Sequence, residues 1–197
     1  SARWEGWVSR RPATHLITGA ASGIGLEVAR RLIDRGDRVV LLVHSEPRVD
    51  ELAQALPGPA SILVVDLADP EAIAEFADDF QNGTPKVELL DSLLHIAGVV
   101  ELSTVSNLDV GDWQRQLDVN LTGPAVLTAR LLPALRRARG TVMFVNSGAG
   151  LAANPSWAAY AASKFGLRAL ADALRAEEAA HGVRVTTVCP SRPATTR

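Results

Sequence analysis

The chain has little cysteine, little net charge and no long apolar run. Its one cysteine, Cys189, cannot form an internal disulfide, and we expect it to be buried and unreactive in a reducing cytoplasm. Because 20 basic and 22 acidic residues leave a formal net charge of -2, the composition does not favour nucleic acid or an anionic membrane as a partner. No apolar stretch approaches the about 18 residues of a membrane-spanning helix, and no signal peptide is visible. A soluble cytoplasmic protein that binds small molecules is therefore expected.

The length and composition predict one folded domain. The chain has 197 residues, of which 47% are hydrophobic and 21% charged, enough for one sizeable core but not for two. We expect residues 12–197 to form that domain and residues 1–11 to be an N-terminal tail. Because the tail carries Trp4 and Trp7, a cloning remnant and an arm that packs on a partner both remain open.

Short apolar runs alternate along the chain with longer stretches of helical period. The expected strands are residues 15–18, 39–43, 61–65, 89–96, 141–146 and 183–188, and their Val, Ile and Leu content suits strands buried on both faces. The expected helices are residues 24–34, 49–56, 70–80, 110–137 and 158–181. This alternation predicts an α/β fold with a doubly wound parallel sheet.

A glycine-rich turn follows the first expected strand and leads into the first expected helix. The segment is Thr18-Gly19-Ala20-Ala21-Ser22-Gly23-Ile24-Gly25. Glycines in such a turn allow a tight bend, close approach of the backbone to a pyrophosphate, and close packing of helix on sheet. The helix N-terminus adds free N–H groups and the positive end of the helix dipole. Placed between a buried strand and a helix, the turn predicts a dinucleotide-binding site.

Tyr160 and Lys164 lie four residues apart within the expected helix 158–181, and Ser147 precedes them in the chain. This spacing places the phenol and the ammonium on one face, about one turn apart. A phenol gives up its proton poorly at neutral pH, but a cation within about 4–6 Å favours the phenolate. The pair therefore predicts a proton-transfer site, although a solvated lysine beside a half-buried tyrosine is the plainer interpretation of the two residues alone.

Together the glycine turn and the later triplet resemble the short-chain dehydrogenase/reductase family, and the resemblance covers residues 14–196. Asp66-Leu67, Ala97-Gly98, Asn120 and Pro190 match further family elements in order. The resemblance implies a Rossmann-like three-layer sandwich in which Asp66 meets the adenine. The cofactor-binding residues that it and the turn imply are Gly19, Ser22, Gly23, Ile24, Gly25, His44, Ser45, Asp66, Leu67, Ala97, Gly98, Tyr160, Lys164 and Pro190.

The resemblance also implies roles for four catalytic residues, and no metal site is expected. Tyr160 exchanges a proton with the carbonyl or alcohol oxygen, and Ser147 hydrogen-bonds the same oxygen. Lys164 supports Tyr160 and binds the nicotinamide ribose, while Asn120 holds a water that links Lys164 to solvent. Taken from the residues alone, Asn120 is alternatively a helix-kink residue that bonds backbone, and Ser147 a turn cap.

Two segments depart from the family pattern. The family's Asn-Asn-Ala-Gly is replaced by His95-Ile96-Ala97-Gly98, and its Pro-Gly by Pro190-Ser191. We expect His95 to replace a structural side chain in a strand and not to act as a catalytic base. The serine puts the backbone geometry of the second turn in doubt.

The end of the second expected strand bears on the choice of nicotinamide cofactor. Family members that use NAD carry an Asp there, whereas this chain has Val43 followed by His44 and Ser45. Without a carboxylate to repel a 2′-phosphate, and with His44, Ser45 or Arg48 as donors, NADP(H) is favoured over NAD(H). Glu46, which lies about twenty residues past the glycines, keeps NAD(H) open.

The sequence thus predicts an NAD(P)-dependent oxidoreductase that acts on a small, apolar carbonyl or alcohol compound. By analogy, residues 148–157 line the substrate entrance. The alternatives are a catalytically impaired dinucleotide-binding regulatory or scaffold protein, and a non-redox enzyme on the same scaffold.

Two further expectations concern the whole molecule. Helices 110–137 and 158–181 have Ala- and Leu-rich faces, which in the family pack across a two-fold axis and here predict a homodimer or homotetramer. Family members continue into a substrate lid and a last strand, and this sequence stops at Arg197 before either. We expect further residues to follow, and the alternative is a protein that lacks a closed substrate pocket.

Overall fold

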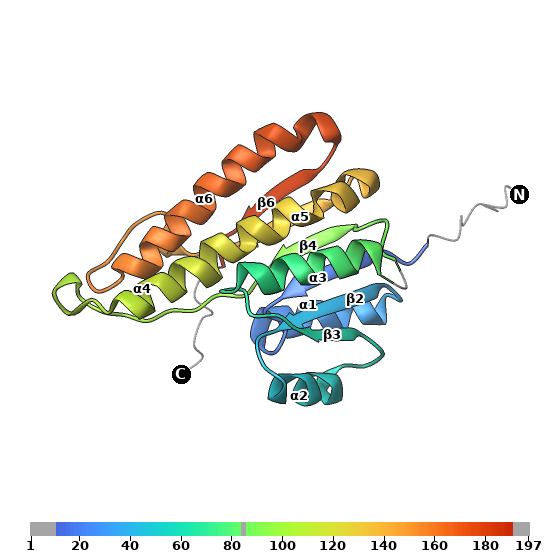
Figure 1. The fold of residues 1–197 in the computed structure, drawn as a ribbon, viewed down its shortest axis with the longest axis horizontal. Helices are drawn as coiled ribbons and strands as arrows, with labels where there is room; N and C mark the ends of the chain where they lie inside the picture. The colour runs from blue at the N-terminus through green and yellow to red at the C-terminus, as the bar shows by residue number, and fades with distance from the viewer. Residues whose placement is uncertain (1–10, 84–85, 191–197) are drawn as a thin grey trace, which may run out of the picture.

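The structure is a computed structural model that describes residues 11–83 and 86–190 (Figure 1). The expected tail, apart from Arg11, and the segment 191–197, which contains Ser191, lie outside the described residues. Within the described part, no helix combines the length and the apolar character that crossing a membrane requires.

Six parallel strands form the centre of the described chain. They are β1 (Thr14–Thr18), β2 (Arg38–Val43), β3 (Ser61–Val64), β4 (Ser92–His95), β5 (Thr141–Val145) and β6 (Arg184–Val188). Their order across the sheet is β3-β2-β1-β4-β5-β6. Leu16 of β1 is aligned with Val40 of β2 on one side and with Leu93 of β4 on the other. The sheet is therefore doubly wound, and its order reverses between β1 and β4.

Helices cover the sheet from both sides and make a three-layer sandwich, so the expected fold class is confirmed (Figure 1). The helices are α1 (Gly23–Asp34), α2 (Pro47–Ala55), α3 (Pro70–Asn82), α4 (Val110–Leu117), α5 (Gly123–Ala138) and α6 (Ala158–Glu178). Helices α1 and α2 pack on one face, and α3, α5 and α6 on the other. Short helical turns occupy Val105–Asn107, Asp118–Thr122, Gly148–Gly150 and Ala179–His181.

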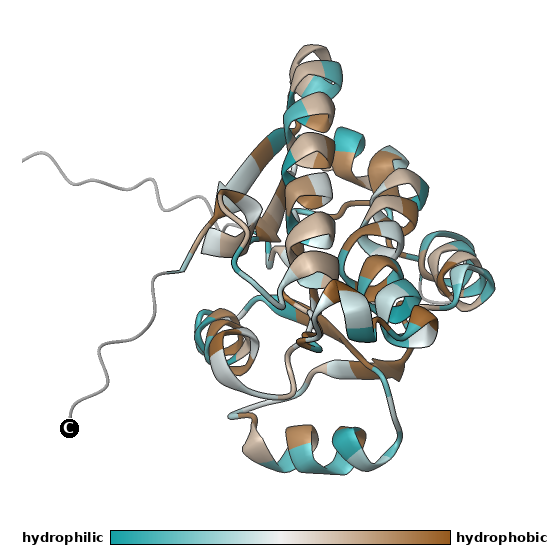
Figure 2. Cartoon of the chain, turned by 90° about the vertical axis from the view of Figure 1, so that its left-hand side faces the viewer, coloured by the Kyte–Doolittle hydropathy of each residue, from teal (hydrophilic) through white to brown (hydrophobic). Residues whose placement is uncertain are grey.

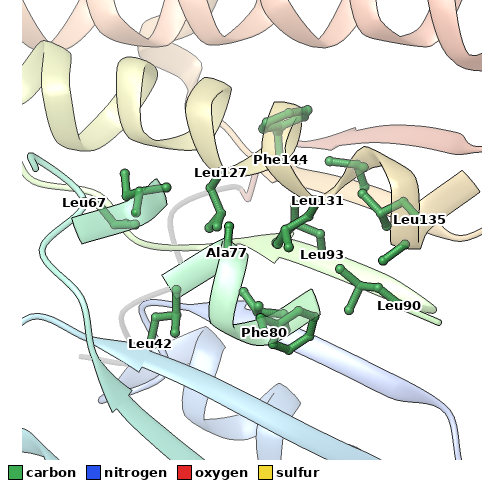
Figure 3. Packing of buried hydrophobic residues seen from close by; sticks show 14 of the residues in the cluster. Leu42, Leu67, Ala77, Phe80, Leu90, Leu93, Leu127, Leu131, Leu135 and Phe144 are labelled. Atoms are coloured by element: carbon green, nitrogen blue, oxygen red, sulfur yellow. The ribbon is translucent and has the colours of Figure 1, made fainter. Parts of the chain in front are cut away.

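Two hydrophobic cores lie on opposite faces of the sheet. The larger one, between the sheet and α3, α5 and α6, contains Leu93, Leu131 and Phe144, all fully buried (Figure 3). The other, under α1 and α2, contains Leu41 and Leu52. Because alternate strand residues point to opposite faces, a strand covered on both sides must be apolar throughout. The hydropathy colouring shows this as mainly brown strands between helices of mixed colour (Figure 2).

The expectation that all strands are buried on both faces is right for β1, β2 and β4 but wrong for β3 and β6. Leu63 and Val64 of β3 are 43% and 40% exposed, and Val188 of β6 is 38% exposed. Both strands lie at edges of the sheet, where fewer elements are available to cover them. The amino-acid composition of a strand alone does not indicate whether the strand lies at the centre or at the edge of the sheet.

The expected helix 110–137 is two helices joined by a π-helical turn. The turn, Asp118–Thr122, lies between α4 and α5 and contains Asn120. An extra residue in the turn shifts the helical phase, so the side chains before and after it face different surroundings. The other expected boundaries differ by a few residues, and expected strand 89–96 shortens to Ser92–His95.

Candidate dinucleotide and active site

A cleft of about 480 Å³ opens at the carboxyl ends of β1, β2, β4 and β5. In open α/β sheets, ligands bind where the strand order reverses, and this cleft lies at that point. Nine of the expected cofactor residues line it: Gly19, Ser22, Gly23, Ile24, His44, Asp66, Leu67, Ala97 and Gly98. The other five, Gly25, Ser45, Tyr160, Lys164 and Pro190, do not line it.

The glycine turn has the geometry of a backbone cradle. Gly19 adopts a left-handed conformation with φ of 73°, and a Cβ there would collide with the backbone of Ala97. A Cβ on Gly25 would collide with the Gly19 carbonyl, so the helix approaches the strand end only because both residues are glycine. The Ser22 side chain makes no capping hydrogen bond to α1. The first N–H groups of α1 therefore remain available to an anion, and the cradle fits the pyrophosphate of a dinucleotide.

Two arginines line the part of the cleft beyond β2 and β3. Arg48 lies on α2 and pairs with Glu51 at 2.7 Å, while His44, at the end of β2, is exposed.

Asp66 follows β3 and lies 3.7 Å from the guanidinium of Arg115 on α4. Sequence reasoning missed Arg115, because α4 reaches the cleft only through the tertiary fold. Glu46, the candidate acidic ribose partner, does not line the cleft.

Lys164 is buried behind the cleft lining, next to Gly98 and Val145. It is 4% exposed, and its ammonium donates a hydrogen bond to the Val145 carbonyl at 3.1 Å, where Val145 itself lines the cleft. Its Nζ lies 5.8 Å from the centroid of the Tyr160 ring. Burial lowers the pKa of Lys164 from 10.5 to about 8, against a smaller raising effect of Cys189. The lysine thus remains mainly a cation at neutral pH, next to the half-buried phenol ring.

Gly98 lies between the cleft and the side chains of Asn120 and Lys164. The Asn120 carboxamide is 1% exposed, accepts from the Val99 N–H and donates to the Val99 carbonyl, both at 2.8 Å. It also donates to the Ser163 hydroxyl at 3.1 Å. A Cβ on Gly98 would lie 3.3 Å from Asn120 Oδ1 and 3.6 Å from Lys164 Nζ. The bare backbone of Gly98 therefore separates the cleft from both side chains, and Asn120 joins the Val99 backbone to Ser163 of α6.

Ser147 begins the turn Gly148–Gly150 directly after β5. Its hydroxyl is half-buried and accepts from the Ala149 N–H at 3.2 Å. The preceding residue, Asn146, is 5% exposed and hydrogen-bonds to both Ser147 and Lys164. Sequence reasoning took Asn146 only as the end of a strand. No local pattern indicates its contacts, because Lys164 is brought to it by α6.

His95 lies in the larger core. Its ring stacks on Phe144 with 4.9 Å between the ring centroids, and Nε2 lies 2.8 Å from the Thr128 hydroxyl. Burial lowers the pKa of this histidine to about 3. The ring is therefore neutral at physiological pH and braces β4 against β5 and α5, as a structural residue does.

The expected burial of Cys189 is wrong, because this residue is exposed after the end of β6. Pro190 is also exposed. The cysteine follows the edge strand of the sheet, so the apolar run that contains it is not covered on both sides. Among residues 11–83 and 86–190, no three His, Cys, Asp or Glu side chains gather closely enough to hold a metal ion.

The strand order, the glycine cradle and the cleft at the switch point define a dinucleotide-binding α/β domain of the Rossmann type. Comparison with known proteins narrows this class. The family model of the short chain dehydrogenases matches residues 13–197, and the chain belongs to that family.

Individual proteins similar to this chain support the same family assignment. A bovine protein named dehydrogenase/reductase SDR family member 7B is 37% identical over 191 residues, which cover 91% of this chain and 58% of the bovine protein. Meso-2,3-butanediol dehydrogenase of Serratia marcescens is 32% identical, covering 89% and 69%. A metagenomic short-chain oxidoreductase solved in complex with NADP superposes with a TM-score of 0.81 at 32% identity, covering 91% and 82%. The chain thus spans less than two thirds of the bovine relative's length.

Proposed function

We propose that this chain is an oxidoreductase that interconverts a small apolar carbonyl compound and the corresponding alcohol with a nicotinamide dinucleotide. The observation that carries the proposal is the buried ammonium of Lys164 beside the Tyr160 ring, separated from the glycine-lined cleft by the backbone of Gly98. A dinucleotide in the cleft supplies the hydride acceptor or donor. The protein's own groups then need to bind and orient the substrate and to transfer one proton.

In this proposal the phenol of Tyr160 gives its proton to the substrate oxygen in reduction and takes it back in oxidation. The ammonium of Lys164 lies beside the Tyr160 ring, and Ser147 donates a hydrogen bond to the same oxygen as charge develops there. Asn120 contributes by fixing the Val99 backbone and Ser163, and thereby the lining of the site beside Lys164. A water between Asn120 and Lys164 remains part of the proposal.

The entrance to the site supports an apolar substrate. The segment 156–157 lies beside Ser103, because the Ser103 N–H donates to the Ser156 carbonyl at 3.0 Å and Ser103 forms a β-bridge with Trp157. Leu102, next to Ser103, and Leu151, ahead of Ser156 in the chain, are 53% and 58% exposed. The Trp157 ring meets the Tyr160 ring edge-on at 5.8 Å between centroids. An apolar wall next to a proton donor suits a ketone or aldehyde with a hydrocarbon substituent.

Replacing the proton donor tests the proposal. Tyr160→Phe keeps the ring and removes the hydroxyl, so turnover of a panel of apolar ketones and aldehydes, followed by NADPH absorbance, is expected to fall about 100-fold or more. Binding of NADPH, measured by calorimetry, is expected to change by less than about threefold, because the glycine cradle is untouched. Trp157→Phe serves as a matched aromatic control that retains measurable turnover. Turnover by Tyr160→Phe equal to that of the wild type would contradict the mechanism.

We propose NADP(H) as the preferred cofactor. No acidic side chain follows β2 in the cleft lining, whereas Arg48 lies there and can exchange its exposed partner Glu51 for a 2′-phosphate. The KM for NADPH is expected to be lower than that for NADH. Arg48→Glu should raise the KM for NADPH about tenfold or more and leave the KM for NADH nearly unchanged, with Arg38→Glu outside the cleft as the control. A wild-type preference for NADH would refute this assignment.

We further propose that the chain works in the cytoplasm as a homodimer or homotetramer, with residues 12–197 as one catalytic domain. Support for association comes from α6, whose outer face carries the exposed stripe Ala162, Phe165, Ala169 and Ala173 at helical spacing. Phe165 is 43% exposed in one subunit, so a second copy would bury an aromatic ring that water now contacts.

A further inference from the structure

Asn146 occupies the point where three elements of the active site meet. It follows β5 directly, and its backbone N–H donates to the carbonyl of Val188, the last residue of β6, at 2.8 Å. The residue before it, Val145, accepts the Lys164 ammonium, and the residue after it is Ser147. The side chain is 5% exposed, so its polar atoms are withdrawn from water and depend on protein partners.

The Asn146 carboxamide joins the serine turn to the lysine helix. Its Oδ1 accepts the Ser147 N–H at 2.8 Å, and its Nδ2 donates to the main-chain carbonyl of Lys164 at 3.1 Å. Exchanging the two atoms would set oxygen against a carbonyl and NH₂ against an N–H, so the partners fix the orientation of the amide. With Val145 binding the ammonium, two consecutive residues thus hold both the side chain and the backbone of Lys164.

Gly150 makes this bridge possible. A Cβ at this position would lie 2.5 Å from Asn146 Oδ1 and 2.9 Å from the Lys164 carbonyl oxygen. The serine turn closes over the amide only because no side chain intervenes. Of the common side chains of this length, Asp keeps the acceptor but lacks the donor, and Leu lacks both.

We propose that Asn146 is a positioning residue that fixes the distance between the Ser147 hydroxyl and the Lys164–Tyr160 pair. The proposal rests on the oxidoreductase function proposed above. In this role Asn146 touches neither substrate nor cofactor and acts through the backbone of Ser147 and Lys164. Because a displacement of about 1 Å at a reacting group lowers rates by about 100-fold, a bridge between the two halves of a proton-transfer site controls turnover.

A double-mutant cycle tests the proposal. Asn146→Asp retains the acceptor for Ser147 and loses the donor to Lys164, and we expect its kcat to fall about 10- to 100-fold while the KM for NADPH changes less than about threefold. In a Ser147→Ala background the same substitution should lower kcat by no more than about twofold, because the serine that it positions is gone. Asn146→Ser, a smaller change, keeps the cycle measurable if the aspartate variant is poorly folded.

Amide hydrogen exchange of the free protein supplies a readout that does not need turnover. In Asn146→Ser, exchange at Ser147 and in the turn Gly148–Gly150 is expected to accelerate at least tenfold, with β1 unchanged as the internal control.

The possible failures are distinguishable. Each of three results would overturn the positioning role. They are unchanged hydrogen exchange in the turn, unchanged kcat, and a kcat loss in the double variant equal to the product of the losses caused by the Asn146 and Ser147 substitutions. Wild-type turnover by Tyr160→Phe would instead overturn the proposed function.

Discussion

Lys164 is a buried cation whose burial opposes folding. Its ammonium has one described hydrogen bond, to the Val145 carbonyl, and is 4% exposed. The lowering of its pKa from 10.5 to about 8 corresponds to about 3 kcal/mol of unfavourable free energy in the charged folded state. Nothing in packing requires a charge there, and under the proposed mechanism the ammonium is kept for its place beside Tyr160.

A stability measurement tests this account. Lys164→Met keeps the length of the side chain without the charge, and it is expected to raise the free energy of unfolding at pH 7 by about 1–3 kcal/mol while abolishing turnover. The unfolded chain binds the Lys164 proton more tightly than the folded one, so wild-type stability attributable to this group rises between about pH 8 and 10.5.

The difference between Lys164→Met and the wild type should therefore shrink toward zero as the pH approaches 10.5. Urea titrations of both proteins at pH 7 and pH 10 measure it, and Arg168→Met, an exposed change on the same helix, is the control. A Lys164→Met variant less stable than the wild type at pH 7 would contradict the account.

At the scale of elements, the π turn Asp118–Thr122 decides which residues meet. It directs Asn120 to the backbone of Val99, while Arg115, on α4 before the turn, faces Asp66 across the cleft. One helical segment thus contacts both Asp66 at the cleft and Ser163, the residue before the lysine. Such turns are frequent at functional sites for this reason.

Helix α6 presents two faces with different tasks. Ser163, Lys164 and Leu167 face the interior, and the stripe defined above by Ala162, Phe165, Ala169 and Ala173 faces outward. If this stripe joins two copies, Phe165→Glu should dissociate the assembly, since a charge would be buried in the contact. Light scattering after size exclusion should then give the mass of one chain.

The control for this experiment is Arg168→Glu, which changes charge at an exposed position beside the stripe and should leave the mass unchanged. A wild-type protein that already has the mass of one chain at micromolar concentration would refute the proposed assembly.

At the scale of the whole molecule, opposite ends of the sheet have different roles. At the amino ends of the strands, carboxylates tie neighbouring segments: Asp37 accepts the Ala13 N–H at 3.0 Å, and Asp91 accepts the Thr14 N–H at 2.8 Å and binds Arg11. At the carboxyl ends lie the glycine cradle, the cleft and the buried lysine. The ion pairs that tie segments together and the groups of the candidate site thus lie at opposite ends of the strands, as parallel α/β sheets allow.

The sequence by itself determined what depends on neighbours along the chain. Alternation of apolar runs with helical periods predicted the doubly wound sheet, because strands covered on both faces must be apolar throughout. The turn from Gly19 to Gly25 and the Tyr160–Lys164 step are local, so their spacing alone predicted a phosphate cradle and a paired phenol and ammonium. The catalytic roles drawn from that spacing remain predictions.

Only the tertiary structure decided which distant residues meet. No local sequence pattern indicates the contact of Asn146 with Lys164 or that of Arg115 with Asp66. Each contact joins elements that come together only on folding. Exposure of Cys189 and of β3 likewise follows from position at a sheet edge. Local pattern fixes the kind of element, whereas burial and contact depend on free energy gained between elements, which no single segment contains.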